Sequence, residues 1–428
     1  MFIQYDILIY RQTIAIPGRT DYESNFYKNM RIDKVRHLKN INIQISENEC
    51  RHIILTGKNG SGKTSVLDAI AIFINSITTG TNPAEVVAKI NDTKERIEFY
   101  VKTQNEDYLQ KDKDNLKYLT GQYINVTAGM WLDFNTSFTK IQKEFKAGRF
   151  IVAYYKADRV FSSVEPKHVE KVQLKSEYMI NQMPRTEFIK YLLDLKMTQA
   201  LAVTGGKKDK AHTISVWFEN FNNLLKQIFN DESVEMVFDE DTFKFSIVMD
   251  GREPFDFNTL SSGYAAVLDI VADLIIRMEK QINRSFDFNI PGVVLIDEIE
   301  THLHLELQKN ILKLLTTVFP NIQFIVSSHS PFILNCLDNV VIYDLEKNMF
   351  VKDGLSNVPY SGIVEGYFKI DELSNELRNK FDAYKALVNK LNLDADDYEE
   401  IADLEKITGF DQRRIEICSF QKMLYPGK

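Results

Sequence analysis

The sequence predicts an α/β protein in which helices pack against a mixed sheet. Apolar runs typical of buried strands alternate with helical runs late in the chain, in the order VVLIDE, LELQKNILKLLTTVF and QFIVSSH. Earlier, a glycine-rich turn separates the apolar run Arg51–Leu55 from the helical run TSVLDAIAIFINSI. A strand, a glycine-rich turn and a helix in this order indicate a phosphate-binding unit.

The composition is that of a globular protein. Hydrophobic residues make up 44% of the 428-residue chain and charged residues 26%, which excludes a fibrous or wholly disordered protein. The net charge of −8 argues against a surface that coats nucleic acid as a whole, although a local basic groove is compatible with it. Three widely spaced cysteines and no long uncharged run predict a reduced, cytoplasmic chain without a membrane partner.

Five segments are expected along the chain. Strand-like pieces, ERIEFYV and YINVTAGMWLDF, indicate an antiparallel β lobe within the first half of the core. The segments are residues 1–29 (N-terminal extension), 30–159 (first part of the core with the variable lobe), 160–235 (helical insertion), 236–352 (second part of the core) and 353–428 (C-terminal helices).

An apolar stripe marks the C-terminal helices. Its members recur at intervals of three and four and therefore share one helix face. The stripe either packs on its own domain or offers a docking surface to a partner. It consists of Leu373, Leu377, Phe381, Tyr384, Leu387 and Leu391.

The run GKNGSGKT fits the phosphate-loop pattern at every fixed position. Its glycines let backbone N–H groups turn inward around the β- and γ-phosphates, Lys63 supplies a positive charge and the Thr64 hydroxyl ligates Mg²⁺. A simple helix-capping turn is the alternative, which the flanking strand and helix disfavour. The expected nucleotide contacts are Gly57, Asn59, Gly60, Ser61, Gly62, Lys63, Thr64 and Ser65.

Three further runs have the residues that nucleotide chemistry needs. VVLIDE ends in Asp297, expected to hold Mg²⁺, and Glu298, expected to act as general base. LSSGY offers the Ser261 hydroxyl, the Gly263 amide and a helix N-terminus to an anion. His329, after a second buried strand, stands where a γ-phosphate sensor is required. Each run alone is weak, since capping turns and structural histidines are common, but the order of the four signals is specific.

In this order the residues resemble ABC-type ATPase heads of the SMC, RecF and overcoming-lysogenisation-defect (OLD) kind, from Met30 to about Leu345. GKNGSGKT looks like the Walker A motif, LSSGY like the signature, LIDEIETHLH like Walker B and the D-loop, and SSHS like the switch-histidine loop. The resemblance implies an ATP- and Mg²⁺-dependent ATPase with Arg36 near the nucleotide. It also implies a head-to-tail dimer in which Ser261 and Gly263 of one copy close on the γ-phosphate held by Lys63 of the other.

The sequence departs from the family pattern at several positions. No glutamine occurs between Tyr155 and Arg159, where the family has its Q-loop. Four further positions also differ from the family pattern. None of these replacements removes a phosphate ligand or the base, but slow hydrolysis is compatible with them. A zinc site at His302 and His304 is disfavoured, because that segment resembles the D-loop. The other replacements are Ser262, Tyr264, Ile299 and Leu305.

Standalone heads of this type resemble the ATPase subunits of bacterial anti-phage operons such as Septu and retron-associated systems. OLD-type nucleases add a Toprim domain, but fewer than about a hundred residues follow His329 and Asp394-Ala-Asp396 sits at a helix start. The expected effector, a nuclease or toxin, is therefore encoded separately.

Two alternative functions stay open. A RecF-like repair ATPase would clamp DNA, and an ATP-stabilised scaffold would turn over negligibly. Basic residues that either line a DNA-facing surface or belong to solvated loops are Lys156, Arg159, Lys167, Lys171, Lys175, Lys207, Lys208 and Lys210.

Overall fold

A computed structural model describes residues 25–166 and 168–363, together with positions 366, 380, 383, 384, 386, 387, 390, 400 and 401. The chain divides into two compact units, Met1–Asn357 and Val358–Lys428. Most of the expected N-terminal extension and the Asp394–Asp396 pair lie outside the described residues. Of the apolar stripe, Tyr384 is buried and Leu387 is half-buried, while Leu373, Leu377, Phe381 and Leu391 lie outside the described residues. In unit 2 the described part includes the short helix α11 (Tyr360–Gly362).

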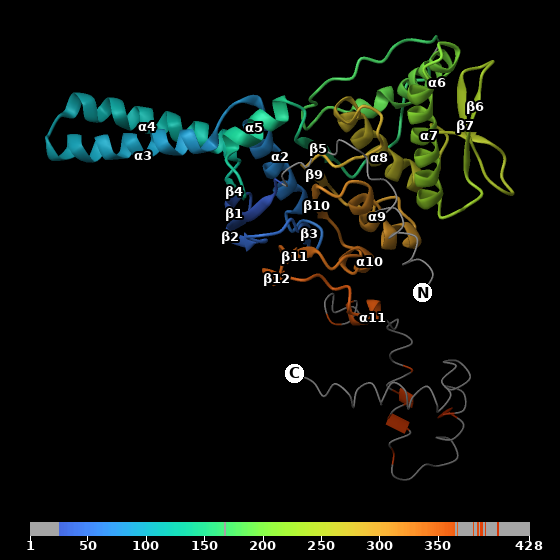
Figure 1. Cartoon of the computed structure of the whole chain (residues 1–428). Coiled ribbons are helices and arrows are strands. Elements are labelled where there is room, and N and C mark those ends of the chain that lie inside the picture. The colour runs from blue at the N-terminus through green and yellow to red at the C-terminus, as the bar shows by residue number, and fades with distance from the viewer. Residues whose placement is uncertain are drawn as a thin grey trace. The chain divides into compact units, whose positions relative to one another are not determined.

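A six-stranded mixed sheet forms the centre of unit 1 (Figure 1). Five strands are parallel and the edge strand β12 runs antiparallel to β11. The inner strands are buried along their whole length, which explains their unbroken apolar sequences. The α/β prediction is confirmed. In spatial order the strands are β12 (Met349–Val351), β11 (Val340–Asp344), β3 (His52–Thr56), β10 (Ile322–Ser327), β9 (Gly292–Ile296) and β5 (Ile151–Tyr155).

An antiparallel sheet, in the order β2-β1-β4, forms the expected β lobe. Its strands are β1 (Tyr27–Val35), β2 (Leu38–Gln44) and β4 (Met130–Phe134). The strand β1 begins at Tyr27, so the boundary placed after residue 29 cuts through it. The reason is that Tyr27 is fully buried and its ring contacts Phe134 at 4.2 Å between centroids.

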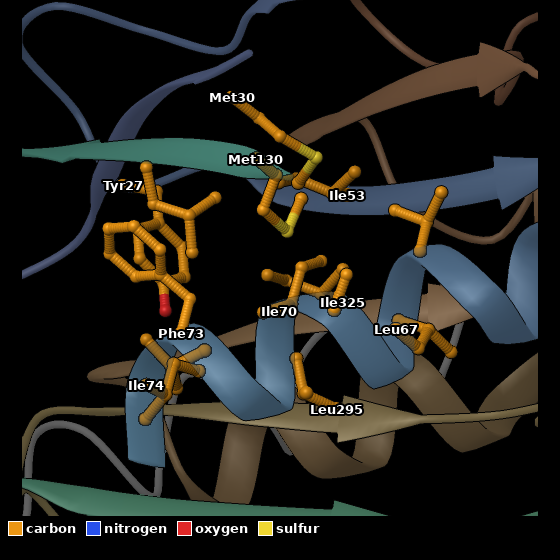
Figure 2. Close-up of a cluster of buried hydrophobic side chains, with 14 of the residues drawn as sticks. Tyr27, Met30, Ile53, Leu67, Ile70, Phe73, Ile74, Met130, Leu295 and Ile325 are labelled. Carbon is orange, nitrogen blue, oxygen red and sulfur yellow. The ribbon is translucent and has the colours of Figure 1, made fainter. Parts of the chain in front are cut away.

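Helix α2 (Lys63–Thr79) fills the space between the two sheets. Figure 2 shows its side chains Leu67, Ile70, Phe73 and Ile74 among residues of both sheets, including Met30 and Met130 from one sheet and Ile53, Leu295 and Ile325 from the other. Each fully buried side chain of this size contributes about 1.5–3 kcal/mol. The phosphate loop therefore precedes a helix that is fixed on two sides.

Helices α3 (Pro83–Lys102) and α4 (Glu106–Thr127) lie side by side as an antiparallel hairpin (Figure 1). The expected strands ERIEFYV and the first part of YINVTAGMWLDF were wrong, because both fall in these helices. Asn82 caps α3 through the amide of Ala84, Pro83 occupies the first turn, and Arg96 pairs with Asp112 across the hairpin. These local signals outweigh the β-branched and aromatic residues in both runs.

The expected helical insertion begins later than predicted. Residues 160–166 and 168–183 form neither helix nor strand, and helices start only at η1 (Pro184–Glu187). Polar and β-branched residues dominate this connection, so no amphipathic helix face exists there. The helices that follow are α6 (Phe188–Thr204) and α7 (Lys208–Phe229), then a small sheet of β6 (Glu235–Asp239), β7 (Lys244–Val248) and β8 (Phe255–Asp256).

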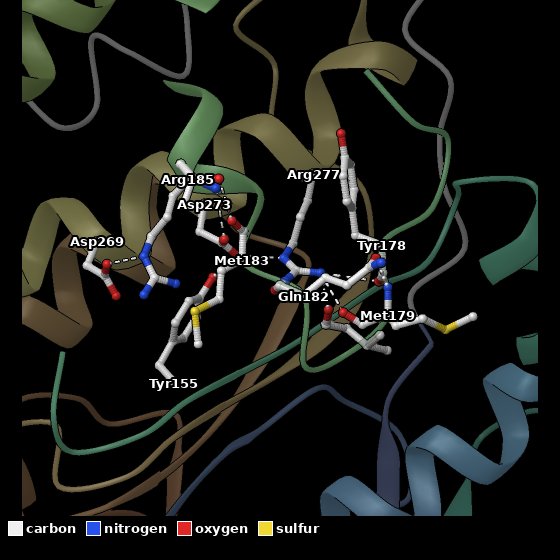
Figure 3. Close-up of polar contacts among 11 residues, drawn as sticks. Tyr155, Tyr178, Met179, Gln182, Met183, Arg185, Asp269, Asp273 and Arg277 are labelled. Carbon is white, nitrogen blue, oxygen red and sulfur yellow. Dashed lines mark hydrogen bonds and ion pairs between the residues drawn. The ribbon is translucent and has the colours of Figure 1, made fainter. Parts of the chain in front are cut away.

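Helix α8 (Ser262–Ile282) connects this insertion to the main sheet through a buried polar network (Figure 3). Arg277 donates from Nε to Asp273 at 2.6 Å and from its terminal nitrogens to the carbonyl oxygens of Val152 and Gln182. Tyr155 of β5 donates to the other side of the network, at Asp273 Oδ2, over 2.8 Å. Burying these charges is tolerable because each is paired or hydrogen-bonded.

The remaining helices cover the sheet and the ends of its strands. They are α5 (Phe138–Lys146), α9 (Leu305–Val318) and α10 (Pro331–Leu334). Within the described ranges, no helix has both the length and the hydropathy required to cross a bilayer.

A buried carboxyl on α8 predicts a pH dependence of stability. Glu279 is 2% exposed and accepts a hydrogen bond from Trp217 Nε1 at 3.4 Å. Burial raises the pKa of Glu279 to about 7. Tyr191, Trp217 and Arg284 lower this pKa, but they offset the effect of burial only in part. Because the unfolded value is about 4.3, the folded state binds the proton more tightly. Protonated Glu279 therefore stabilises the folded state. This contribution to the free energy of unfolding is complete below about pH 4 and is lost as the pH rises through about 7. Its size is about 1.4 kcal/mol for each unit of difference between the folded and unfolded pKa.

The Glu279→Gln variant keeps the shape of the side chain and loses its charge. Its melting temperature is expected to fall less than that of the wild type between pH 4 and pH 8, as measured by thermal unfolding across this range. Glu232→Gln, an exposed carboxylate on the same unit, serves as the matched control. Parallel pH profiles for wild type and Glu279→Gln would contradict the assignment.

Candidate functional site

The phosphate loop follows β3 and ends at the first turn of α2. Gly57, Gly60 and Gly62 have φ values of +126°, +84° and +101°, a conformation that side chains disfavour. The loop is folded back on itself, because Lys63 Nζ donates to the carbonyl oxygens of Gly57 at 2.9 Å and Lys58 at 3.2 Å. The helix N-terminus and the lysine thus meet at one place, which suits a phosphate.

Thr64 and Asp297 come together although they are 233 residues apart. The Thr64 hydroxyl donates to Asp297 Oδ2 at 2.8 Å, and the Ser327 hydroxyl donates to Oδ1 at 2.5 Å. Asp297 and Ser327 lie at the carboxyl ends of β9 and β10, and Thr64 lies in the first turn of the helix that follows β3. Ligands of parallel sheets bind at this edge. A carboxylate, a hydroxyl and substrate oxygens are the ligand set that Mg²⁺ prefers, so the residues present fit this ion.

Glu298 sits in a strained turn directly after β9. Its backbone has φ +44°, its amide donates to Ser327 Oγ at 2.7 Å, and its carboxylate accepts a hydrogen bond from Thr301 Oγ1 at 3.2 Å. The side chain is only partly buried. A left-handed conformation at a non-glycine residue costs free energy and persists only where the surroundings enforce it. The turn therefore directs this carboxylate away from the strand.

His329 lies after β10 next to a carboxylate that the sequence analysis missed. Its amide donates to Glu300 Oε1 at 2.5 Å, while His329 Nε2 and Glu300 Oε2 are buried and have no hydrogen-bond partner. Burial lowers the pKa of His329, and the positive charge of Lys63 lowers it further. The imidazole is therefore held neutral, with one ring nitrogen free for a ligand. The sequence EIE contained Glu300, but no motif in the expected pattern assigned it.

Burial also affects Lys63 and Ser61 of the phosphate loop. Removal from water lowers the pKa of Lys63, and the charge of Glu298 opposes this lowering. The Ser61 hydroxyl is buried without a hydrogen-bond partner. Buried polar atoms without partners are unusual in folded proteins, and here Ser61 Oγ and His329 Nε2 belong to the loops that the sequence assigns to the triphosphate. The residues present thus fit ATP.

The turn between β1 and β2 packs against the phosphate loop. Arg36 is exposed in this turn with φ +50°, and the ring of His37 lies 3.2 Å from the carbonyl oxygen of Ser61. A Cβ atom at Gly62 would come within 2.9 Å of Leu38, so glycine is required for this approach. Arg36 immediately precedes His37, which contacts the loop, and its position near a nucleotide stays a prediction. Asn59 and Gly60 are exposed at its tip, while Ser65 is half-buried in the first turn of α2.

The signature residues lie at the start of α8. Ser261 is exposed at the N-cap position and its hydroxyl makes no capping hydrogen bond. Gly263 is buried against the D-loop, since a Cβ there would meet the His302 carbonyl oxygen at 3.0 Å. Within the described part of one chain, no hydrogen bond joins Ser261 or Gly263 to the phosphate loop. The Ser261 hydroxyl therefore remains available to a group outside its own chain.

The D-loop histidines have structural surroundings. His304 caps α9 by accepting from the amide of Leu307 at 3.5 Å, and its ring packs edge-on against Tyr264. His302 occupies a left-handed turn at φ +69°. Among the residues that the structure describes, no three His, Cys, Asp or Glu side chains converge as a metal site.

Arg159 corrects one expectation from the sequence. It was grouped with lysines of a DNA-facing surface, but it is 4% exposed and its guanidinium donates to backbone carbonyl groups. Lys167 lies outside the described residues. The other lysines of that group are exposed: Lys156, Lys171, Lys175, Lys207, Lys208 and Lys210.

Comparison with known proteins finds a family match and several relatives. Residues 164–335, which include the signature, Asp297, Glu298 and His329 but not the phosphate loop, match the family described as "AAA domain, putative AbiEii toxin, Type IV TA system". The chain is 24% identical to the Septu protein PtuA of Bacillus mycoides (strain KBAB4) over 401 residues, which are 90% of this chain and 50% of PtuA.

A second relative and a solved structure extend the comparison. Over 180 residues the chain is 33% identical to the protein named "Retron Vc95 probable ATPase" of Vibrio cholerae serotype O1 biovar El Tor, covering 37% of this chain and 33% of that protein. A crystal structure of an SMC head bound to the C-winged helix domain of ScpA aligns with 78% of this chain and 100% of its own, with a TM-score of 0.40 and 13% identity. The chain thus spans a third to a half of the curated relatives' lengths. It is similar to a Septu PtuA protein over most of its own length, and its residues 164–335 are similar to the AAA domain family named above.

Proposed function

We propose that this chain binds ATP and Mg²⁺, hydrolyses ATP, and does so as a head-to-tail pair of identical copies. The observation that supports hydrolysis best is the direct connection of the phosphate loop to the acidic strand end, through Thr64, Asp297 and Ser327. Glu298 follows the end of β9 by two residues, and His329 follows the end of β10 by two residues. The groups that one copy is proposed to contribute therefore lie near the same edge of the sheet.

Each side chain has a distinct part in this reaction. The loop amides and Lys63 bind the β- and γ-phosphates, while Thr64 and Asp297 hold Mg²⁺. When bound, this ion neutralises charge on the phosphate oxygens. Glu298 accepts the proton of the attacking water as the bond from the γ-phosphorus to the bridging oxygen breaks. Neutral His329 donates one N–H to the γ-phosphate, because its pKa is lowered by burial and by Lys63.

The second copy supplies the remaining donors. Ser261 is exposed, makes no capping bond and precedes an α8 of 21 residues, so its hydroxyl and the helix N-terminus can approach an anion of a partner. Neither half alone neutralises a triphosphate, so ATP binding and pairing stabilise each other. Hydrolysis removes the bridging phosphate and weakens the pair.

We further propose a cytoplasmic role in anti-phage defence with a separately encoded effector. The support is the resemblance to a Septu PtuA protein and to a retron ATPase. This chain covers half of that PtuA, so the trigger and the effector of PtuA cannot be transferred to it. The trigger and effector of this chain are to be found by experiment. Co-purification with the product of the adjacent gene tests this part, and a stable complex that is altered by ATP is the expected result.

Phosphate release from ATP tests the enzymatic part. The purified chain is expected to release phosphate with Mg²⁺ and to lose this activity in the presence of EDTA, because Thr64 and Asp297 act through the ion. Lys63→Ala, which removes the charge at the loop, provides the blank. Phosphate release by the wild type at the level of this blank would reject an ATPase and leave the scaffold alternative.

A further inference from the structure

Arg159 holds the turn that contains Glu298. It follows β5 by four residues, in the segment where the resembled family has a glutamine that this chain lacks. Its terminal nitrogens donate to the carbonyl oxygens of Asp297 at 2.6 Å, Glu298 at 2.9 Å and Ile299 at 3.2 Å. A fourth bond reaches the Lys156 carbonyl oxygen at 3.1 Å. One planar guanidinium thus ties three successive carbonyl groups together, which a lysine ammonium cannot do with the same geometry.

The conformation of that turn makes Arg159 necessary. Glu298 has φ +44°, and its neighbours Asp297 and Ile299 are buried. Buried carbonyl oxygens that lose their partners destabilise the conformation that buries them, so without Arg159 the turn is expected to relax from its left-handed conformation. The amide of Glu298 is held from the opposite side by Ser327. Between them, these two contacts fix the direction in which the Glu298 carboxylate points.

The segment that presents Arg159 is itself anchored. Phe161 is buried and packs on Phe257, with 6.3 Å between ring centroids. Ser163 and Asn258 are joined by two hydrogen bonds, from the Ser163 amide to Asn258 Oδ1 at 3.0 Å and from Asn258 Nδ2 to the Ser163 carbonyl oxygen at 3.2 Å. The Ser163 hydroxyl also accepts from the amide of Ile189 at 3.1 Å. Arg159 is therefore supported by a rigid connection, as a group that must position another residue requires.

We propose that Arg159 is a positioning residue that orients Glu298 for attack on the γ-phosphate. The inference rests on the proposed ATPase function and adds a residue to it. The hydrogen bonds that the structure describes for Arg159 go to backbone carbonyl groups after β5 and after β9, and none goes to the phosphate loop. Arg159 therefore acts on the chemical step and leaves the phosphate loop intact. A displacement of Glu298 by about 1 Å is enough to lower kcat by about 100-fold.

The test compares Arg159→Met and Arg159→Lys with the wild type, and uses Arg149→Met as control. Arg149 precedes the other end of β5 and pairs with Glu144. Phosphate release is divided by the number of ATP-binding sites, which are titrated with a fluorescent ATP analogue. Arg159→Met is expected to lower kcat per site by about 100-fold with KM changed by less than about twofold, and Arg159→Lys by an intermediate factor. Millimolar guanidinium ion is expected to restore part of the activity of Arg159→Ala.

The outcomes separate the inference from the proposed function. If kcat per binding site in Arg159→Met equals that of the wild type, Arg159 has a structural role only and the inference is overturned. If Arg159→Met fails to fold, Arg159→Lys is compared with the wild type instead. A kcat per site in Arg159→Lys equal to that of the wild type would then overturn the inference. If the wild type itself releases no more phosphate than Glu298→Gln, the proposed function fails, and the inference fails with it.

Discussion

Glu298→Gln is expected to lower ATP turnover by about 1,000-fold while ATP binding stays within about twofold of the wild type. Glutamine keeps the size of the side chain but cannot accept the proton of the attacking water. The groups proposed to bind the nucleotide and its ion, Lys63 and Thr64, are untouched by the change. Steady-state phosphate release and titration with a fluorescent ATP analogue measure the two quantities separately.

The control for this variant is Glu306→Gln. Glu306 is exposed in the first turn of α9, so its amide variant is expected to retain wild-type turnover. The neighbouring carboxylate Glu300, which accepts from the amide of His329, provides the competing assignment. If Glu298→Gln retains more than a tenth of the activity while Glu300→Gln loses it, the general base has been misassigned.

Mixing two inactive variants is expected to restore activity. Lys63→Ala damages the phosphate loop and Ser261→Arg places a bulky cation at the helix N-terminus that faces the partner, so each variant alone is expected to be inactive. In a mixed pair, one site combines Ser261 from the first copy with Lys63 from the second and is intact. At equal concentrations half of the pairs are mixed and each has one of two sites intact, so about a quarter of wild-type turnover is expected.

The readout is phosphate release measured across mixing ratios, with a maximum at equal amounts. Mixing either variant with a copy that has both substitutions provides the control, because no intact site can form. Activity that stays at the sum of the separate variants at every ratio would show that Ser261 does not serve the nucleotide of another copy.

The residues proposed for the site could be predicted because each lies in a local pattern. Lys63 and Thr64 stand at fixed positions of a glycine-rich loop, and Asp297 and Glu298 end an unbroken apolar run. Both Thr64 and Asp297 were expected to hold Mg²⁺, and their side chains lie 2.8 Å apart in the structure.

The helical hairpin of α3 and α4 was not predicted, because its residues favour both strand and helix. The run ERIEFYV contains the β-branched and aromatic residues of strands, and its helix buries only Pro83, Val86 and Thr93. Asn82 and Pro83, a cap followed by a proline in the first turn, were the signals that favoured a helix.

Arg159 and Glu300 could not have been assigned from the sequence. Arg159 acts through carbonyl groups 138 to 140 residues away, and backbone acceptors leave no residue pattern to detect. Glu300 accepts a hydrogen bond from the amide of His329, 29 residues later, so this contact is also made through the backbone. Side chains that bind main-chain atoms are the part of a site that motifs cannot predict.

The molecular mass of Glu298→Gln in solution tests most directly whether ATP is held between two copies. Light scattering is measured with Mg²⁺ and ATP, with Mg²⁺ and ADP, and for the double variant with Ser261→Arg. The account predicts that ATP, but not ADP, doubles the mass of Glu298→Gln, and that the double variant binds ATP yet keeps the single mass. A double variant that pairs as readily as Glu298→Gln would contradict it.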